Sequence, residues 1–403
     1  METKGSQEKV RIFTLGFILL SLVNICSFMA WQIIFTGLPI YLASLEASSV
    51  EVGLVSSLAM FGSIICRPFT GVLVDTYGRK GFLYAGYIVM ALCSFCYAIF
   101  PIVGVIFATR FIHGLAWGFS STAINTVSVD IFPRKRFSEA AGYYALTGSL
   151  ALALGPAIAV WMAEGGHEQL MVVLAGVLTT AGILIAVVMF SRAYKEPPLK
   201  KDKTLRETMV PSNMFEKTAV FPSLIHGLLS MGYICMNTFG AIMGAERGIE
   251  NMAALFITYA IANVAMRPIL GHIADSKGFF GLGVMSCISC ALSLVILAYA
   301  STLWMIILAG IFTGLGMGTA MSVFYTMAVA IAPPDRRGAA TSTHLFFFNG
   351  GMAVGPFIGG FLVDAFGYGG MYLTIAGLSV LTCIVFVLYG KERIDMYHTK
   401  QQG

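Results

Sequence analysis

An arginine and a histidine stand about one helical turn apart inside an apolar stretch of this chain. Arg110, His113 and Trp117 follow each other at spacings of three and four residues, so an α-helix would place them on one face. A histidine can exchange a proton near neutral pH, and an arginine can bind an anionic group. Because an arginine in a membrane span is energetically costly, this face predicts a site for proton transfer or anion binding.

Each of these residues also has a plainer interpretation. Arg110 could extend to the outer surface from the first turns of its helix, and His113 could be an interior histidine with a packing role. Carboxylates are the other proton carriers to consider, but the first apolar segment contains none. Asp130 and Glu139 are the carboxylates at the membrane edge. Glu139 therefore stays beside Arg110 and His113 as a candidate for proton coupling.

A second polar pattern occurs twice, 200 residues apart. The two copies are Arg67-Pro68, Gly71, Asp75, Gly78 and Arg267-Pro268, Gly271, Asp275, Gly278. The same offset relates a set of glycines and prolines, Gly114, Gly118, Gly155-Pro156, to Gly314, Gly318, Gly355-Pro356. The shared register predicts a duplicated membrane domain. Two homologous bundles with the substrate between them are typical of secondary transporters.

The elements that hold these residues must be membrane helices. Of 403 residues, 57% are apolar and 11% are charged, which leaves too little polar surface for a soluble protein. Runs of about 20 apolar residues can cross a bilayer, and they predict twelve helices at 12–42, 51–71, 82–102, 103–130, 139–163, 168–191, 219–243, 251–271, 279–299, 302–331, 339–363 and 369–390. Only Pro101 and Gly104 mark the boundary between the third and fourth of these helices. We expect an all-α integral membrane protein with two pseudo-symmetric six-helix bundles.

Positive charge marks one side of the membrane. Clusters such as Arg79-Lys80 and Arg336-Arg337 fall at alternate helix ends, and basic loops stay in the cytoplasm. Both termini are therefore expected to be cytoplasmic, in a multi-pass protein of the cell membrane. The basic segment 192–218 predicts a cytoplasmic linker between an N-terminal bundle at 1–191 and a C-terminal bundle at 219–403. Topology explains the net charge of +5, so no nucleic-acid partner is expected.

Signatures of catalysis and of metal binding are weak in this sequence. It has no lysine-containing phosphate loop, no zinc-protease motif and no serine nucleophile elbow. The pairs Cys93, Cys96 and Cys287, Cys290 fall in predicted spans without neighbouring His or acidic ligands. We therefore expect no enzymatic activity, no metal and no cofactor.

The segment Gly71-Val72-Leu73-Val74-Asp75-Thr76-Tyr77-Gly78-Arg79-Lys80 resembles the loop signature between helices two and three of the major facilitator superfamily. The resemblance covers the whole chain and implies a transporter with the twelve-helix major facilitator fold. It also implies that Asp75 braces the start of helix eleven, and that Arg79 pairs with Asp130 to hold the outward-open state. From the residues alone, Asp75 and Asp275 could accept hydrogen bonds from the exposed amides of a nearby helix start.

The plainer interpretation of this motif is a charge cluster that keeps the loop inside. The role of Asp275 stays open because the second copy lacks the Arg-Lys pair. We expect the protein to act as a monomer in the lipid bilayer, with protons and a small molecule as its ligands.

The direction of transport depends on the fifth predicted helix. This helix contains Gly142, Gly148, Gly155 and Pro156, and the pattern resembles the signature of antiporters in this superfamily. Small residues and a proline allow close packing and a bend, and Gly355-Pro356 repeats that bend in helix eleven. The match departs at Ile158 and Ala159, where the signature has glycines. Proton-driven export is the preferred prediction, with a proton-coupled importer of a nutrient as the alternative.

The predicted substrate cavity lies between helices one, four, seven and ten. Besides Arg110 and His113, its candidate lining residues are Asn24, Trp31, Gln32, Trp117, Tyr233, Asn237, Phe324 and Tyr325. This mixture favours an amphipathic organic molecule, either a drug or an endogenous metabolite. Arg110 would suit an anionic group on it, as in a carboxylated metallophore.

Overall fold

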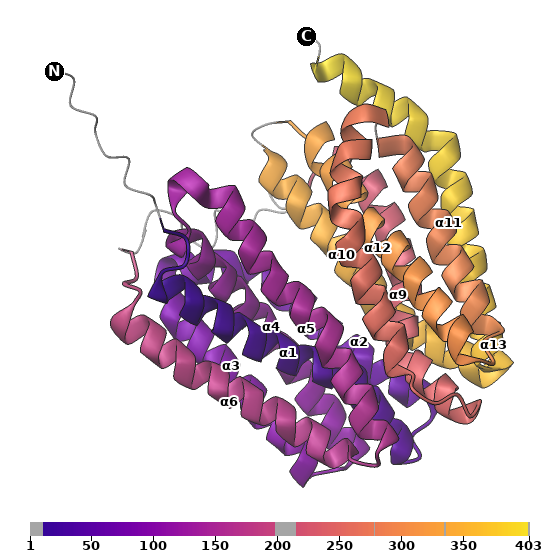
Figure 1. Ribbon diagram of the computed structural model, residues 1–403, viewed down its shortest axis with the longest axis horizontal. Helices are drawn as coiled ribbons and strands as arrows, with labels where there is room; N and C mark the ends of the chain where they lie inside the picture. The colour runs from indigo at the N-terminus through magenta and orange to yellow at the C-terminus, as the bar shows by residue number, and fades with distance from the viewer. Residues whose placement is uncertain (1–10, 198–214, 278, 334–335, 402–403) are drawn as a thin grey trace.

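The structure is a computed structural model that describes residues 11–197, 215–277, 279–333 and 336–401 (Figure 1). The side chains of Asp75 and Asp275, and of some residues near them, lie outside the described part. Within the four ranges the chain is helical and holds no strand. The prediction of an all-α protein is therefore confirmed.

The first bundle consists of six long helices. They are α1 (Leu15–Ser44), α2 (Ser49–Tyr77), α3 (Arg79–Ile99), α4 (Val103–Ile131), α5 (Phe137–Glu164) and α6 (Glu168–Arg192). A short 3-10 helix, η1 (Arg134–Arg136), precedes α5. The predicted break at Pro101 falls between α3 and α4, because the proline cannot donate the backbone hydrogen bond that would continue α3.

The second bundle follows the 3-10 helix η2 (Lys217–Ala219). It consists of α9 (Val220–Glu246), α10 (Ala253–Lys277), α11 (Phe279–Ala298), α12 (Leu303–Ile331) and α13 (Arg337–Gln401). The helix α13 contains two predicted spans, which meet in a kink at Gly367. Gly367 has φ 68°, a left-handed conformation that glycine adopts without a steric penalty. With α13 counted as two, the helices described here agree with the twelve that were predicted.

The internal repeat is visible in how helices pack. A Cβ added to Gly114 of α4 would lie 2.1 Å from the Ala59 carbonyl oxygen of α2, and one added to Gly314 of α12 would lie 2.5 Å from the Tyr259 carbonyl oxygen of α10. Glycine lets the backbones approach this closely. The glycine offset of 200 residues thus corresponds to equivalent helix contacts in the two bundles.

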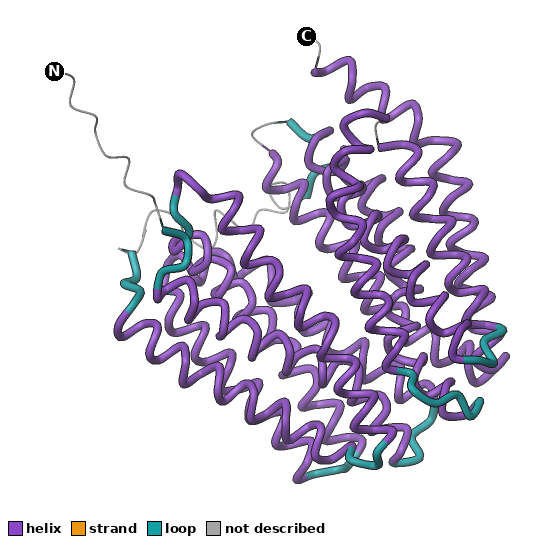
Figure 2. The backbone as a smooth tube through the Cα atoms, viewed as in Figure 1, coloured by secondary structure: helices purple, strands orange, loops and turns teal. Residues whose placement is uncertain are grey.

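The two bundles together have two ends, and we name each end by the loops that it holds. The linker end holds the turn at Gly78, the segment 132–136 and both ends of the linker, and the opposite end holds the turns at 45–48, 165–167 and 247–252. In Figure 2 the loops of the opposite end lie at the bottom. The helices of the two bundles converge at the opposite end and diverge toward the linker end (Figure 1).

Direct contacts join the bundles toward the opposite end. The Thr36 hydroxyl of α1 donates to Asn237 Oδ1 of α9 at 3.0 Å. The Thr238 hydroxyl of α9 donates to the Ser56 hydroxyl oxygen of α2 at 3.1 Å. Because both hydrogen bonds are buried, they exclude water from this end of the interface between the bundles.

The closest approach between the bundles uses glycine. A Cβ added to Gly53 of α2 would lie 2.0 Å from the Pro356 carbonyl oxygen of α13, and one added to Gly360 of α13 would lie 2.5 Å from the Ser49 carbonyl oxygen. We call this contact of Ser49, Gly53, Pro356 and Gly360 the glycine seam. Any larger side chain at Gly53 requires the two bundles to separate here.

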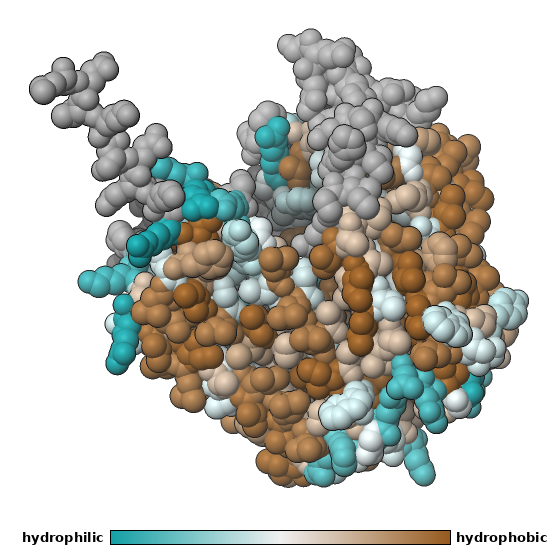
Figure 3. Space-filling view, viewed as in Figure 1, coloured by the Kyte–Doolittle hydropathy of each residue, from teal (hydrophilic) through white to brown (hydrophobic). Residues whose placement is uncertain are grey.

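The outer surface is apolar between the two ends. The space-filling view shows a brown apolar belt, with hydrophilic residues gathered toward the ends (Figure 3). Large side chains on this belt are exposed, including Trp161 at 69% and Leu184 at 64%. Such exposure would be unfavourable in water, and it is the normal condition of a lipid-facing helix surface.

Candidate functional site

Arg110 is completely buried in the first bundle. Its side chain has 0% exposure, and none of its three guanidinium nitrogens has a hydrogen-bond partner among the described residues. The guanidinium carbon lies 5.1 Å from the ring centroid of Trp31 and 5.8 Å from that of Phe35, both on α1. Cation–π attraction to these rings therefore partly replaces the lost hydration. Tyr97 of α3 is a further electrostatic neighbour.

The alternative placement of Arg110 at the outer surface is wrong. Full burial excludes a side chain that extends to the headgroups, since such a side chain would be partly exposed. The reason is local: Arg110 is held between α1 and α3 by Trp31 and Tyr97. At the equivalent position of the second bundle, a Cβ on Gly310 would lie 2.1 Å from Thr258 Oγ1, so no large side chain fits there.

His113 lies beside Arg110 and is also buried. Its Nδ1 lies 3.1 Å from the Tyr97 hydroxyl, and its Nε2 has no partner among the described residues. The imidazole packs edge-on against Trp31 with ring centroids 5.5 Å apart. We name Arg110, His113, Tyr97, Trp31 and Phe35 the Arg110 cluster. It combines a fixed positive charge with a phenol and an imidazole that can pass a proton between them.

An aromatic wall continues from this cluster. The indoles of Trp31 and Trp117 are stacked with centroids 4.7 Å apart, and the rings of Phe28 and Trp117 are stacked with centroids 5.6 Å apart. Trp31 is buried, whereas Phe28 and Trp117 are only half-buried. The spacing of Arg110, His113 and Trp117 along α4 did predict residues that meet, because they share one helix face.

The remaining cavity candidates have different surroundings in the structure. Asn24 donates from Nδ2 to the Thr147 hydroxyl of α5 at 2.7 Å, and Gln32 packs against Gly155. Tyr233 of α9 packs against Tyr259, with ring centroids 5.3 Å apart. These three therefore help to hold helices together, whatever surface they also present to a substrate.

Asn237 and Tyr325 lie at different ends of the second bundle. Asn237 is buried and accepts a hydrogen bond from Thr36 in the contact between the bundles. Tyr325 of α12 is 36% exposed and lies 3.5 Å from the Thr341 hydroxyl. Phe324, its neighbour, is fully buried. Helical spacing could not distinguish these positions, because it does not give the rotation of each helix.

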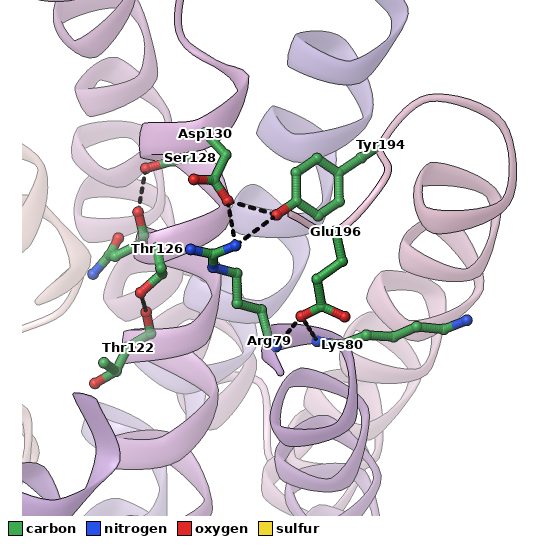
Figure 4. A network of polar contacts seen from close by, with 9 residues as sticks. Arg79, Lys80, Thr122, Thr126, Ser128, Asp130, Tyr194 and Glu196 are labelled. Carbon is green, nitrogen blue, oxygen red and sulfur yellow. Dashed lines mark hydrogen bonds and ion pairs between the residues drawn. The ribbon is translucent and has the colours of Figure 1, made fainter. Parts of the chain in front are cut away.

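A polar network closes the linker end of the first bundle (Figure 4). Arg79 Nη1 lies 2.9 Å from Asp130 Oδ2, and the Tyr194 hydroxyl donates to the same oxygen at 2.6 Å. Burial and the hydrogen bond to Asp130 raise the pKa of Tyr194. The phenol therefore stays neutral at physiological pH and keeps its proton available for Asp130.

The Arg79–Asp130 ion pair that was predicted from the family resemblance is present, and its role in holding the outward-open state stays a prediction. The pair is present while the bundles are joined at the opposite end. Both residues belong to the first bundle, on α3 and α4, so a movement of one bundle against the other need not separate them.

Glu196 takes a role that the sequence suggested for aspartate. Its carboxylate accepts hydrogen bonds from the backbone N–H groups of Arg79 and Lys80, at the start of α3 (Figure 4). Gly78 between α2 and α3 has φ 100°, which favours glycine, and a Cβ there would lie 3.1 Å from this carboxylate. Glu196 is visible in the sequence as an acidic residue in a basic linker. Its partners could not be predicted because they lie more than 100 residues away in the sequence.

The other predicted site residues have simpler surroundings. Glu139 is exposed at the linker end and pairs with Arg136 at 2.6 Å, away from the Arg110 cluster. Gly71 is exposed, with no atom within 4 Å of an added Cβ. The carboxylates of Asp75 and Asp275 lie outside the described residues.

The predicted helix bends lie inside continuous helices. A Cβ on Gly155 of α5 would lie 2.5 Å from Gln32 Cβ of α1, and one on Gly355 of α13 would lie 2.8 Å from Ile234 Cγ2 of α9. Pro156 and Pro356 follow within α5 and α13. In this state the two Gly-Pro positions therefore serve close packing.

Sequence analysis missed a contact between the bundles. Glu164, at the end of α5, accepts a hydrogen bond from the Met252 backbone N–H at 2.8 Å, just before α10. A carboxylate is favourable at a helix start. A capping preference could have indicated the acid, but not that its partner is in the other bundle.

A hollow of about 800 Å³ lies at the linker end of the first bundle. Its lining includes Asp130, Arg134, Arg192 and Tyr194. It adjoins the Arg79 network and lies apart from the Arg110 cluster, so it is not the central cavity that the sequence predicted. The eight cysteines are all free thiols, and no group of three potential metal ligands occurs among the described residues.

Removal of the Asp130 charge is expected to destabilise the linker end. Asp130→Asn should lower the melting temperature of the purified protein by a few degrees, since a partly buried ion pair contributes about 1 kcal/mol. Thermal unfolding in detergent measures this. The exchanged variant Arg79→Asp/Asp130→Arg should recover part of the loss. An Asp130→Asn protein as stable as the wild type would mean that the pair contributes nothing.

Comparison with known proteins agrees with this architecture. The chain is 25% identical over 373 residues to the quinolone resistance protein NorA of Staphylococcus aureus (strain MSSA476), covering 91% of this chain and 94% of NorA. It is 24% identical over 369 residues to the multidrug resistance protein MdtG of Enterobacter lignolyticus (strain SCF1), covering 88% and 87% respectively.

Solved structures share the fold at low identity. The nucleoside transporter NupG has a TM-score of 0.78 at 15% identity, over 93% of this chain and 98% of NupG. A POT family transporter in complex with 5-aminolevulinic acid has a TM-score of 0.76 at 13% identity, over 94% and 96%. The model of the Major Facilitator Superfamily matches residues 20–303 and 282–401. The chain belongs to the Major Facilitator Superfamily, and it is a multi-span membrane transporter.

Proposed function

We propose that this transporter exports a small organic molecule across the cell membrane in exchange for protons. The observation that carries the proposal is the Arg110 cluster. A buried cation without an acidic partner among the described residues is costly, and the equivalent position of the second bundle is Gly310. Next to it, His113 and Tyr97 can exchange a proton, and the aromatic wall offers a surface for a substrate.

Export is favoured by two further observations. The relatives reported above are named for resistance to quinolones and to multiple drugs. Of the glycines in the antiporter signature, Gly155 packs closely against Gln32 of α1, whereas an added Cβ on Gly142 would have no atom within 4 Å. We place the linker end in the cytoplasm on the basis of its positive charge. In this orientation, the described state has its bundles joined at the external side.

The proposed substrate is a flat aromatic or amphipathic molecule with an anionic group. The half-buried rings of Phe28 and Trp117 can stack on such a molecule, and Arg110 can bind a carboxylate if Trp31 moves aside. A quinolone has this chemistry, because it combines an aromatic ring system with a carboxylate. An endogenous carboxylated metabolite has it as well.

A proton-coupled importer is the second candidate. It is supported by the departure of α5 from the antiporter signature at Ile158 and Ala159. The fold similarity to NupG does not decide between the two, because the major facilitator fold serves transport in either direction.

Comparison of metabolites tests the proposal and its direction. Cells that lack the gene and cells that overproduce the protein are compared, in the cell interior and in the medium. Export predicts a compound that is retained inside without the protein and released with it. A compound that stays in the medium without the protein would support import and overturn the proposal.

The loop motif provides a separate test of alternating access. Asp75→Asn should reduce transport while leaving the amount of protein in the membrane unchanged, because we propose that this aspartate acts on the balance between states. Transport assays and membrane quantification measure the two quantities. The matched control is Asp275→Asn, whose loop lacks the Arg-Lys pair and whose effect should be smaller. An unchanged rate in Asp75→Asn would exclude the proposed role.

A further inference from the structure

A pair of histidines is buried in the second bundle. Nδ1 of His226 on α9 lies 3.0 Å from Nε2 of His344 on α13, and the two rings are stacked with centroids 5.0 Å apart. Both residues have 0% exposure. Phe348 stacks on His226 at 4.7 Å. The pair thus joins two helices within an apolar environment, which is an unusual place for two titratable groups.

The nitrogen atoms of this pair can bind one additional proton. The contact at 3.0 Å uses one N–H as donor and the facing nitrogen as acceptor. In the neutral pair, one of the two outer nitrogens carries a hydrogen and the other has a free lone pair. Those outer nitrogens, Nε2 of His226 and Nδ1 of His344, have no partner among the described residues. A proton on the free lone pair leaves the central hydrogen bond intact.

A second additional proton would break the pair. Both facing nitrogens would then carry N–H, and two donors cannot hydrogen-bond each other at 3.0 Å. The two positive charges would also repel each other in an apolar site. The geometry is therefore that of a one-proton site.

Among the described residues, no negatively charged group lies next to the histidine pair to balance an additional proton. On α12, Tyr325 faces His344 with ring centroids 5.4 Å apart. At the linker end, the Glu216 carboxylate is already bonded to Arg336, which lowers the pKa of Glu216. Lys217 and Arg337 are exposed. No carboxylate pairs with either imidazole among the described side chains of α9, α12 and α13, so the pair is poised to release as well as to bind a proton.

Tyr325 gives the pair a connection to the surface. It is 36% exposed, and its ring lies edge-on against the imidazole of His344. A movement of Tyr325 that exposed Nδ1 of His344, its outer nitrogen, would give the pair access to water. A proton could then enter or leave without displacement of either helix.

The pair is also mechanically connected to the contact between the bundles. The seam between α9 and α13 is tight beyond it: a Cβ on Gly351 would lie 1.9 Å from the Gly227 carbonyl oxygen, and Ser230 donates to the Phe348 carbonyl oxygen at 3.0 Å. Farther along α13, Pro356 and Gly360 form the glycine seam with α2. A shift between α9 and α13 at the histidines is therefore transmitted toward α2.

We propose that His226 and His344 together form a proton-binding site that holds a single proton and contributes to the coupling of transport. The role in coupling rests on the proposed proton-driven export, whereas proton binding itself does not. The Arg110 cluster in the first bundle and the histidine pair in the second would then be two separate protonation sites.

Counting protons on the purified full chain tests this proposal. Potentiometric titration in detergent is compared for the wild type and His226→Asn/His344→Asn between about pH 4 and pH 8. The range extends below the ordinary titration of histidine because both side chains are buried. We expect the variant to bind one proton fewer. A difference of zero or of two would overturn the one-proton site. The control His167→Asn replaces a single exposed histidine outside the pair.

A measurement on the wild type guards against misfolding of the variant. In protein labelled with ¹⁵N-histidine, a through-space NMR correlation between two ring nitrogens identifies the pair, because they lie 3.0 Å apart. The resonances of both rings should shift together in one step as the pH falls. Rings that titrate independently, or not at all, would contradict the proposal. Neither measurement requires a transport substrate, so the proton site and the export proposal can fail separately.

Discussion

Gly53→Val is expected to abolish most transport while the protein still inserts in the membrane. A Cβ at Gly53 would lie 2.0 Å from the Pro356 carbonyl oxygen, so valine forces the glycine seam apart. Overpacking of this kind costs about 1–3 kcal/mol, which changes a two-state balance by about 5-fold to 150-fold. The protein should therefore populate states in which the opposite end is open.

The measurement for Gly53→Val combines transport with a distance. Spin labels on the two bundles near the opposite end should report a longer distance in the variant, and the transport rate should fall by about tenfold or more. Gly377→Val is the matched control, since Gly377 is an exposed helical glycine with no atom within 4 Å of an added Cβ. An unchanged distance in Gly53→Val would show that the glycine seam does not hold the bundles together.

Arg110→Met is expected to lower transport activity without lowering the stability of the protein. A buried arginine without an acidic partner among the described residues does not stabilise the fold, because the cost of burying its charge is not repaid by an ion pair. Methionine has similar length and no charge. The melting temperature should therefore be unchanged or higher, while proton-coupled transport falls by about tenfold or more if Arg110 acts at the site.

A second substitution at this position distinguishes charge from shape. Arg110→Lys keeps the positive charge but loses the planar group that lies against Trp31 and Phe35. We expect coupling to be impaired in this variant also. Full coupling with lysine would mean that only the charge matters, and a large fall in the stability of Arg110→Met would mean that Arg110 has a structural role.

The fold was predictable because membrane helices follow simple rules. Continuous apolar runs gave the place of every span, although α2, α10 and α13 extend well past their predicted ends. The offset that relates Gly114 to Gly314 gave equivalent packing in the two bundles. The spacing of Arg110, His113 and Trp117 gave a correct common face. These predictions succeeded because helix geometry fixes the relative positions of neighbouring residues on one helix.

Contacts between distant segments were not predictable in the same way. Glu196 caps α3 from the linker, and Glu164 bonds to the other bundle. Asn237, a predicted cavity residue, accepts a hydrogen bond from Thr36 of the other bundle. These positions depend on helix rotation and on how the two bundles meet, and neither is contained in the periodicity of one helix. For the same reason, the sequence could not pair His226 with His344.

Proton exchange in everted membrane vesicles tests the central claim most directly. Respiration acidifies the interior of such vesicles, and the compound identified by the metabolite comparison is then added outside. Exchange predicts that the compound enters and that the interior pH rises, only when the transporter is present, with little response in Arg110→Met. If the compound enters without any proton leaving, or does not enter while intact cells take it up, proton-driven export is contradicted.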